Sequence, residues 1–107
     1  MSSIRYTSED FDHFVGVLIS RWEDAIERKK RWHLFHGEER AVYTEDWPVN
    51  NDIHRHLAGY AAEHELTEDQ KTQWNRLNKL VAEHKKDLEE MGYRVLVPAS
   101  VRGREAA

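Results

Sequence analysis

The stretch that decides the fold is residues 67–92, TEDQKTQWNRLNKLVAEHKKDLEEMG. Large apolar residues and one histidine recur in it every three or four positions, at Trp74, Leu77, Leu80, Val81, His84, Leu88 and Met91. This spacing places them on one side of an α-helix, which must bury that side against something else. Thr67 with Gln70 forms a capping-box pattern, and Gly92 is a typical residue just past a helix end. We therefore predict a helix over 67–91.

A second stripe of the same kind begins near the start of the chain. Its members are Phe11, Phe14, Val15, Leu18, Ile19, Trp22, Ala25 and Ile26. Thr7 or Ser8 precedes it as a candidate N-cap, and Gly37 is a candidate helix end. The spacing predicts a helix over 8–36. The apolar side of this helix stops at Ile26, and a basic run over 28–31, RKKR, follows.

The rest of the chain is harder to assign. Residues 51–66 predict a further helix, preceded by a connection over 38–52 in which 41–43 is extended. Residues 93–97 have the alternation and branched side chains of a short strand, which we expect to pair with 41–43. The segment 99–107 is expected to be a loose tail.

Together these segments predict one mainly helical domain over residues 1–107. The expected architecture is a three-helix bundle with a minor two-stranded β element. A chain of this length has room for a single core. Helices with solvated outer faces also fit the composition, which is 34% charged and 39% hydrophobic.

The composition also limits the function. The chain has 20 acidic and 16 basic side chains, a net charge of -4, which disfavours general nucleic-acid binding. It has no cysteine, which excludes disulfides, thiolate zinc sites and cysteine nucleophiles. We see neither an apolar run long enough for a membrane span nor a secretion signal, so we expect a cytoplasmic protein without membrane contact.

The strongest local feature is the basic run with its aromatic neighbours at the end of the first predicted helix. Aromatic residues and arginine dominate the energetically important positions of protein interfaces. We therefore expect a partner-binding surface made of Arg28, Lys29, Arg31, Trp32, Phe35 and Trp47. The same residue types could stack on bases and contact phosphates, so an accessory role in nucleic-acid binding is an alternative.

Histidines offer a second alternative, a metal-binding protein or metal-dependent hydrolase. No pair has the four-residue spacing with which two imidazoles on one helix reach a shared ion. The weak candidate ligands are His33, His36, His64 and His84. Solvated or boundary histidines are the commoner explanation for all of them.

No glycine-rich phosphate loop or nucleophile motif is present, so we expect no enzymatic activity and no cofactor. The sequence favours a small acidic interaction protein that binds another protein, with homodimerisation as a further interpretation. Its size and composition are common among inhibitors and adaptors of phages and mobile elements, which is an association and not a physical argument.

Overall fold

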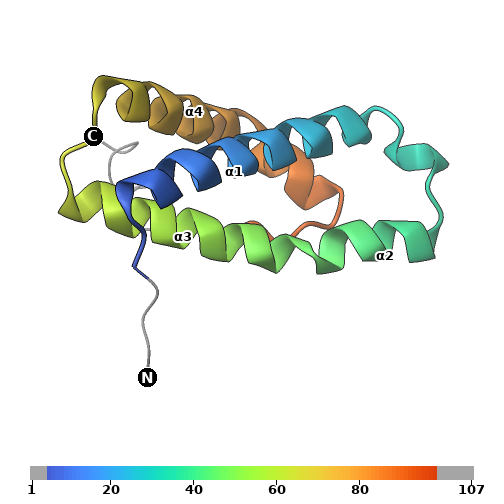
Figure 1. Ribbon diagram of the computed structural model, residues 1–107. Coiled ribbons are helices and arrows are strands. Elements are labelled where there is room, and N and C mark those ends of the chain that lie inside the picture. The colour runs from blue at the N-terminus through green and yellow to red at the C-terminus, as the bar shows by residue number, and fades with distance from the viewer. Residues whose placement is uncertain (1–4, 99–107) are drawn as a thin grey trace.

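Three helical rods form the fold of this computed structural model, which describes residues 5–98 (Figure 1). The first rod is α1 and the third is α4, while α2 and α3 follow each other nearly end to end and together form the second (Figure 1). The elements are α1 (Ser8–Lys29), the 3₁₀ turn η1 (Trp32–Leu34), α2 (Gly37–Glu45), α3 (Trp47–Glu63) and α4 (Glu68–Glu90). The α2–α3 rod runs antiparallel to both of its neighbours, so α1 and α4 are parallel. The prediction of a mainly helical bundle is confirmed.

Two threonines fix the starts of the long helices. The Thr67 hydroxyl accepts a hydrogen bond from the Gln70 amide at 3.1 Å, and the Gln70 side chain accepts one from the Thr67 amide at 3.0 Å. Thr7 and Asp10 make the same reciprocal pair at 3.1 and 2.9 Å. Each pair satisfies two amides that lack a partner within the helix, so both helices begin where the capping patterns indicate.

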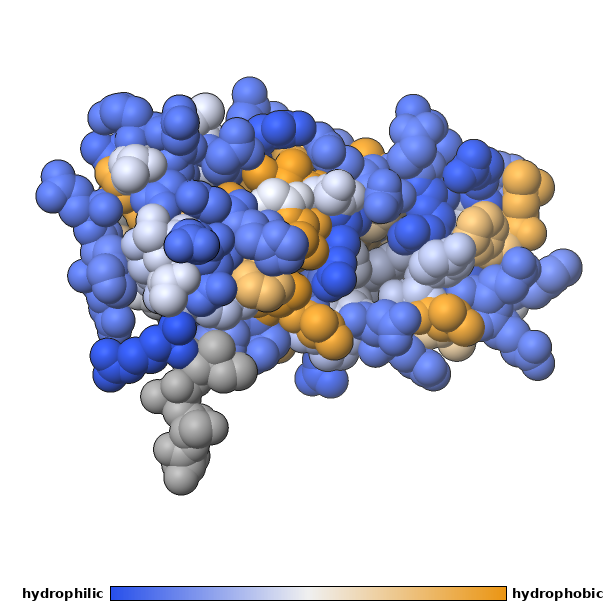
Figure 2. Space-filling model, viewed as in Figure 1, coloured by the Kyte–Doolittle hydropathy of each residue, from blue (hydrophilic) through white to orange (hydrophobic). Residues whose placement is uncertain are grey.

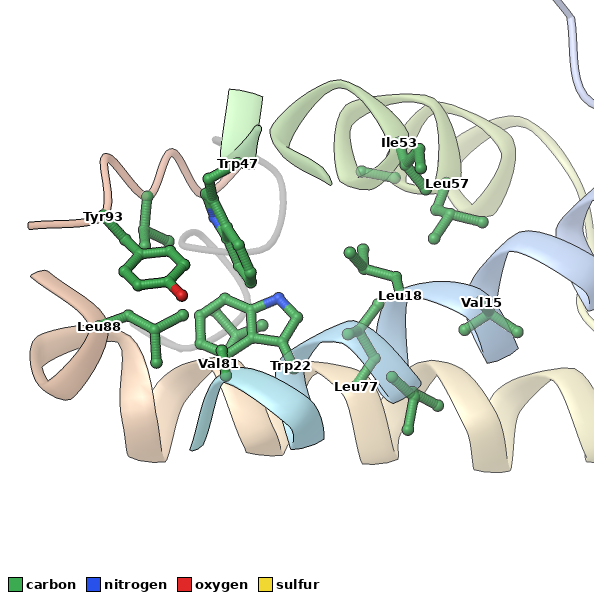
Figure 3. Packing of buried hydrophobic residues seen from close by; sticks show 14 of the residues in the cluster. Val15, Leu18, Trp22, Trp47, Ile53, Leu57, Leu77, Val81, Leu88 and Tyr93 are labelled. Carbon is green, nitrogen blue, oxygen red and sulfur yellow. The ribbon is translucent and has the colours of Figure 1, made fainter. Parts of the chain in front are cut away.

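The core lies where the three rods meet (Figure 3). The largest side chains with almost no exposure are Phe11, Val15, Leu18 and Trp22 of α1, Leu57 of α3, and Leu77, Val81 and Leu88 of α4. Each contributes about 1.5–3 kcal/mol by leaving water. Because α1 and α4 bury the apolar stripes seen in the sequence, this contact organises the molecule.

The first helix is shorter than expected, because α1 ends at Lys29 and not at residue 36. Its apolar stripe has stopped, and the chain turns through η1 instead of continuing as an unpacked helix. Gly37 does not close a helix but begins one. His36 is the N-cap of α2, where its amide donates to a Glu39 carboxylate oxygen at 3.0 Å.

The expected β element is not formed in residues 5–98. Residues 41–43 lie within α2, so 93–97 has no strand to pair with. The side chain of Asn51 takes the place of that strand. Its Nδ2 donates to the Arg94 carbonyl at 2.7 Å, and its Oδ1 accepts from the Leu96 amide at 3.0 Å. The predicted tail, 99–107, lies outside the described residues.

The second predicted helix begins earlier than residue 51, because α3 starts at Trp47. Pro48 fits the first turn of a helix, where its fixed φ is suitable and no amide is needed. The same proline has no N–H to donate to the Thr44 carbonyl. This missing hydrogen bond separates α2 from α3. Only Asp46 lies between them.

Candidate functional site

The basic run does not form one continuous charged surface. Lys29 reaches across to α4, where its Nζ lies 2.6 Å from Asp87 Oδ1. The hydrogen bond to Asp87 raises the pKa of Lys29. Lys30 pairs with Glu27 at 3.1 Å, whereas Arg31 is exposed and makes no side-chain hydrogen bond or ion pair within residues 5–98. Most of the run is thus occupied by contacts within the molecule.

The aromatic residues of the expected surface lie mainly in the core. Trp32 is 9% exposed and Trp47 is 4% exposed, so neither side chain is displayed on the surface that the sequence indicated. The Trp47 ring meets the rings of Trp22 and Tyr93 edge to face, with centroids 5.3 and 4.9 Å apart (Figure 3). Phe35 is half-buried against Trp32 at 5.6 Å. These rings pack together at one end of the bundle, so Trp32 and Trp47 contribute to the core and not to an exposed surface.

Arg28 connects three elements at this end. Its guanidinium lies 3.9 Å above the centre of the Tyr43 ring on α2, and Nη1 donates to the Tyr93 hydroxyl at 2.9 Å. Burial raises the pKa of Tyr93, an effect that the hydrogen bond from Arg28 opposes. The guanidinium is therefore held by an aromatic face and a neutral hydroxyl.

A groove of about 390 Å³ opens beside Arg28, between α1 and the junction of α2 with α3. A hollow between α1 and the α2–α3 rod is visible in Figure 2. Its walls are Arg21, Asp24 and Arg28 from α1, Tyr43 and Asp46 at α2, Trp47, Val49 and Asn50 from α3, and Tyr93. We call this feature the α1–α3 groove.

Arg21 is the second fixed cation of the α1–α3 groove. It lies seven residues, or about two helical turns, before Arg28, which places both on the same side of α1. Arg21 Nη1 donates to Asn50 Oδ1 at 2.8 Å, and Asn50 is only 7% exposed. Arg21, Asn50 and Tyr93 were not among the expected site residues. The two-turn spacing of the arginines is the one sequence signal that could have indicated Arg21.

Exposed apolar side chains gather at the same end of the molecule as the groove. Leu34 of η1 is 64% exposed and Val42 of α2 is 59% exposed, and Tyr43 is also exposed. Figure 2 shows apolar atoms at the end formed by η1 and α2. No residue of α2 is buried. We call η1 and α2 together the η1–α2 end.

The histidines are dispersed. His33 is exposed in η1, and His36 caps α2. The His64 ring stacks on Tyr60 at the end of α3, 4.2 Å between centroids, and His84 Nδ1 lies 3.1 Å from Asp87 Oδ2. Within residues 5–98 no three histidine or carboxylate side chains are arranged to hold a metal ion.

The chain matches no protein-family model, no curated protein and no solved structure. Among residues 5–98, no helix combines the length and the apolar character needed to cross a bilayer.

Proposed function

We propose that this chain is a non-enzymatic interaction protein that binds a partner protein through the η1–α2 end and the adjoining α1–α3 groove. The observation that carries the proposal is the lack of burial in α2. A nine-residue helix is too short to be stable alone in water, and this one has no residue in the core. A partner that covers the exposed side of α2 would complete its packing.

The exposed side chains fit such a contact. Leu34, Val42 and Tyr43 are three of the five large apolar side chains that are exposed in residues 5–98. Arg31, three residues before Leu34 in the chain, is also exposed, and its side chain makes no hydrogen bond or ion pair in the described part of the chain. An apolar patch with an aromatic residue and arginine at its edge is typical of protein interfaces.

Protein binding is favoured over nucleic-acid binding because two of the four cations of the basic run are paired with carboxylates. Lys29 and Lys30 pair with Asp87 and Glu27, and the chain carries a net charge of -4. Phosphate recognition depends on several uncompensated cations in one place. A complex with nucleic acid would weaken steeply as salt increases, whereas an apolar protein contact would change little.

The proposal is tested with Leu34→Ser combined with Val42→Ser. The tagged chain is used to isolate complexes from the cells that produce it. Bound protein is quantified by mass spectrometry at about 0.1 M and about 0.5 M salt, because the higher concentration screens exposed charges more strongly. Leu96→Ser is the matched control, because Leu96 is 60% exposed and lies against Asn51 of α3, outside the η1–α2 end.

We expect one protein to be enriched by the unaltered chain and by Leu96→Ser, and to be reduced at least tenfold by the double variant. The circular dichroism spectrum should be the same for all three. Equal recovery with the double variant, or recovery only of a second copy of this chain, would contradict the proposal.

A further inference from the structure

The α1–α3 groove contains two arginines that are held in place by neutral groups. Arg21 is fixed by Asn50 Oδ1 and Arg28 by Tyr93 Oη and the Tyr43 ring, and neither guanidinium forms an ion pair with a carboxylate of residues 5–98. Each guanidinium has five N–H groups, and a single hydrogen bond leaves most of them available. Two cations thus face the same groove without an ion pair among the described residues.

Two neutral polar side chains, Asn50 and Trp47, also line the groove. Asn50 is 7% exposed, and its Oδ1 accepts the hydrogen bond from Arg21. The indole Nε1 of Trp47 is buried and has no hydrogen-bond partner in residues 5–98, but it is closed off from the groove. The N–H groups of Arg21 and Arg28 are therefore the donors that a ligand in the groove can reach.

The two acidic residues of the groove do not cancel its preference for a ligand that accepts hydrogen bonds. Asp24 and Asp46 line the groove, but both are exposed and neither is part of an ion pair with a described residue. Their carboxylates are therefore solvated and not held in position, whereas Arg21 and Arg28 are oriented by the buried side chains of Asn50 and Tyr93. Donors that are already oriented lose little entropy on binding, which favours an acceptor ligand over a cationic one.

We propose that the α1–α3 groove binds an aspartate or glutamate side chain of the partner protein. The carboxylate would accept hydrogen bonds from Arg21 and Arg28, for which planar guanidinium groups are well suited. Tyr43 and Trp47 supply apolar wall for the methylene groups. A groove of about 390 Å³ has room for one such side chain and its flanking backbone. This inference rests on the proposed function and specifies the partner's chemistry.

The test uses short capped peptides and nuclear magnetic resonance of the full chain. One peptide alternates glutamate with glycine, and the matched peptide has glutamine at each glutamate position. The indole resonance of Trp47 and the side-chain amide resonance of Asn50 report on the groove. We expect the glutamate peptide to shift both resonances in a saturable way and the glutamine peptide to shift neither.

Acetate and inorganic phosphate are titrated at the same concentrations. A partner side chain is the expected ligand only if both ions shift the resonances at least tenfold more weakly than the glutamate peptide. Equal binding by either ion would overturn the assignment to a protein ligand. Equal shifts from the two peptides would overturn the requirement for a carboxylate.

Arg21→Gln is expected to weaken binding of the glutamate peptide about tenfold, which is the typical effect of losing one charged hydrogen bond. Arg76→Gln is the matched control. It removes the same charge, but from an exposed arginine that pairs with Glu23 outside the groove. Unchanged affinity in Arg21→Gln, or an equal loss in Arg76→Gln, would overturn the proposal.

These outcomes separate the inference from the proposed function. If Leu34→Ser with Val42→Ser loses the partner while the glutamate peptide does not bind, the interaction surface stands and the groove assignment fails. If the peptide binds and the double variant retains the partner, the groove stands and the η1–α2 end is not the interface.

Discussion

His54 lies in the core between α3 and α4. It is 3% exposed, its Nε2 is 3.2 Å from Asn78 Oδ1, and its ring meets Trp74 nearly at a right angle, 5.6 Å between centroids. Burial lowers the pKa of His54 to about 4, because the charged ring would lose its hydration, while the hydrogen bond to Asn78 acts in the opposite direction. The ring is therefore neutral in the folded protein at neutral pH.

This burial makes stability depend on pH. In the unfolded chain the pKa of His54 is about 6.5, so the unfolded state binds a proton more readily than the folded state. The contribution of the neutral ring is complete above about pH 6.5 and is lost as the pH falls toward 4. We expect the free energy of unfolding to fall by about 2 kcal/mol between pH 7.5 and 5.

Urea unfolding at several pH values measures this change. In His54→Gln the part of the slope that is due to the histidine should disappear. Parallel stability curves for His54→Gln and the unaltered chain would contradict the assignment.

Sequence reasoning predicted some residues of the core and site well and others poorly. The stripe residues of α1 and α4 were predictable because periodicity alone determines which side of a long helix is buried. Trp32 and Trp47 were expected on the surface because they lie outside any stripe, and only the folded chain shows that both pack against Tyr93. The burial of His54 could not be predicted, because a histidine in a helix is more often a boundary or solvated residue.

At the scale of the elements, the Asn51 side chain substitutes for a β-strand partner of 93–97. Its two hydrogen bonds, to Arg94 and Leu96, hold this segment against α3. Such bonds stabilise a protein by about 1 kcal/mol each. Asn51→Ala should therefore release the segment and increase hydrogen exchange at the Leu96 amide about tenfold or more.

Asn51→Asp provides a graded control for that experiment. The carboxylate keeps an acceptor for the Leu96 amide but loses the donor to the Arg94 carbonyl, so exchange should be intermediate. If the Leu96 amide exchanges equally in all three proteins, the Asn51 side chain does not hold the segment.

The elements that sequence could not predict are those formed by tertiary contacts. α2 lacks an apolar stripe and has no buried residue, so periodicity gave no indication of it. It is held from outside, because Arg40 Nη2 donates to the Trp32 carbonyl at 2.8 Å and Tyr43 packs under Arg28. The groove has the same origin, since its hydrogen-bonded pairs are 29 and 65 residues apart in the chain.

For the molecule as a whole, stability should be unevenly distributed. α1, α3 and α4 share the core, whereas α2 has no residue in it. Segments with few buried contacts open at lower free energy than the core. We expect amides of α2 to exchange through openings whose free energy is at least about 2 kcal/mol below the global free energy of unfolding. Amides of central α4 should exchange only through global unfolding.

Native-state hydrogen exchange at increasing urea concentration checks this expectation. Amides of α2 should exchange with little dependence on urea, as local openings do. Protection in α2 equal to that in α4 would show that the η1–α2 end belongs to the cooperative core. That result would also remove the main support for the proposed interface.

The break at Pro48 limits how far such an opening can travel. Unwinding that starts in α2 does not spread into α3, because no continuous series of backbone hydrogen bonds joins the two helices. The Pro48 nitrogen has no hydrogen to donate, and the Trp47 ring packs against Trp22. A protease that cut the chain within α2 would leave a nicked molecule whose two fragments stay associated through the contacts of α1 with α3 and α4. A cut within α2 would therefore break the chain without unfolding the bundle formed by α1, α3 and α4.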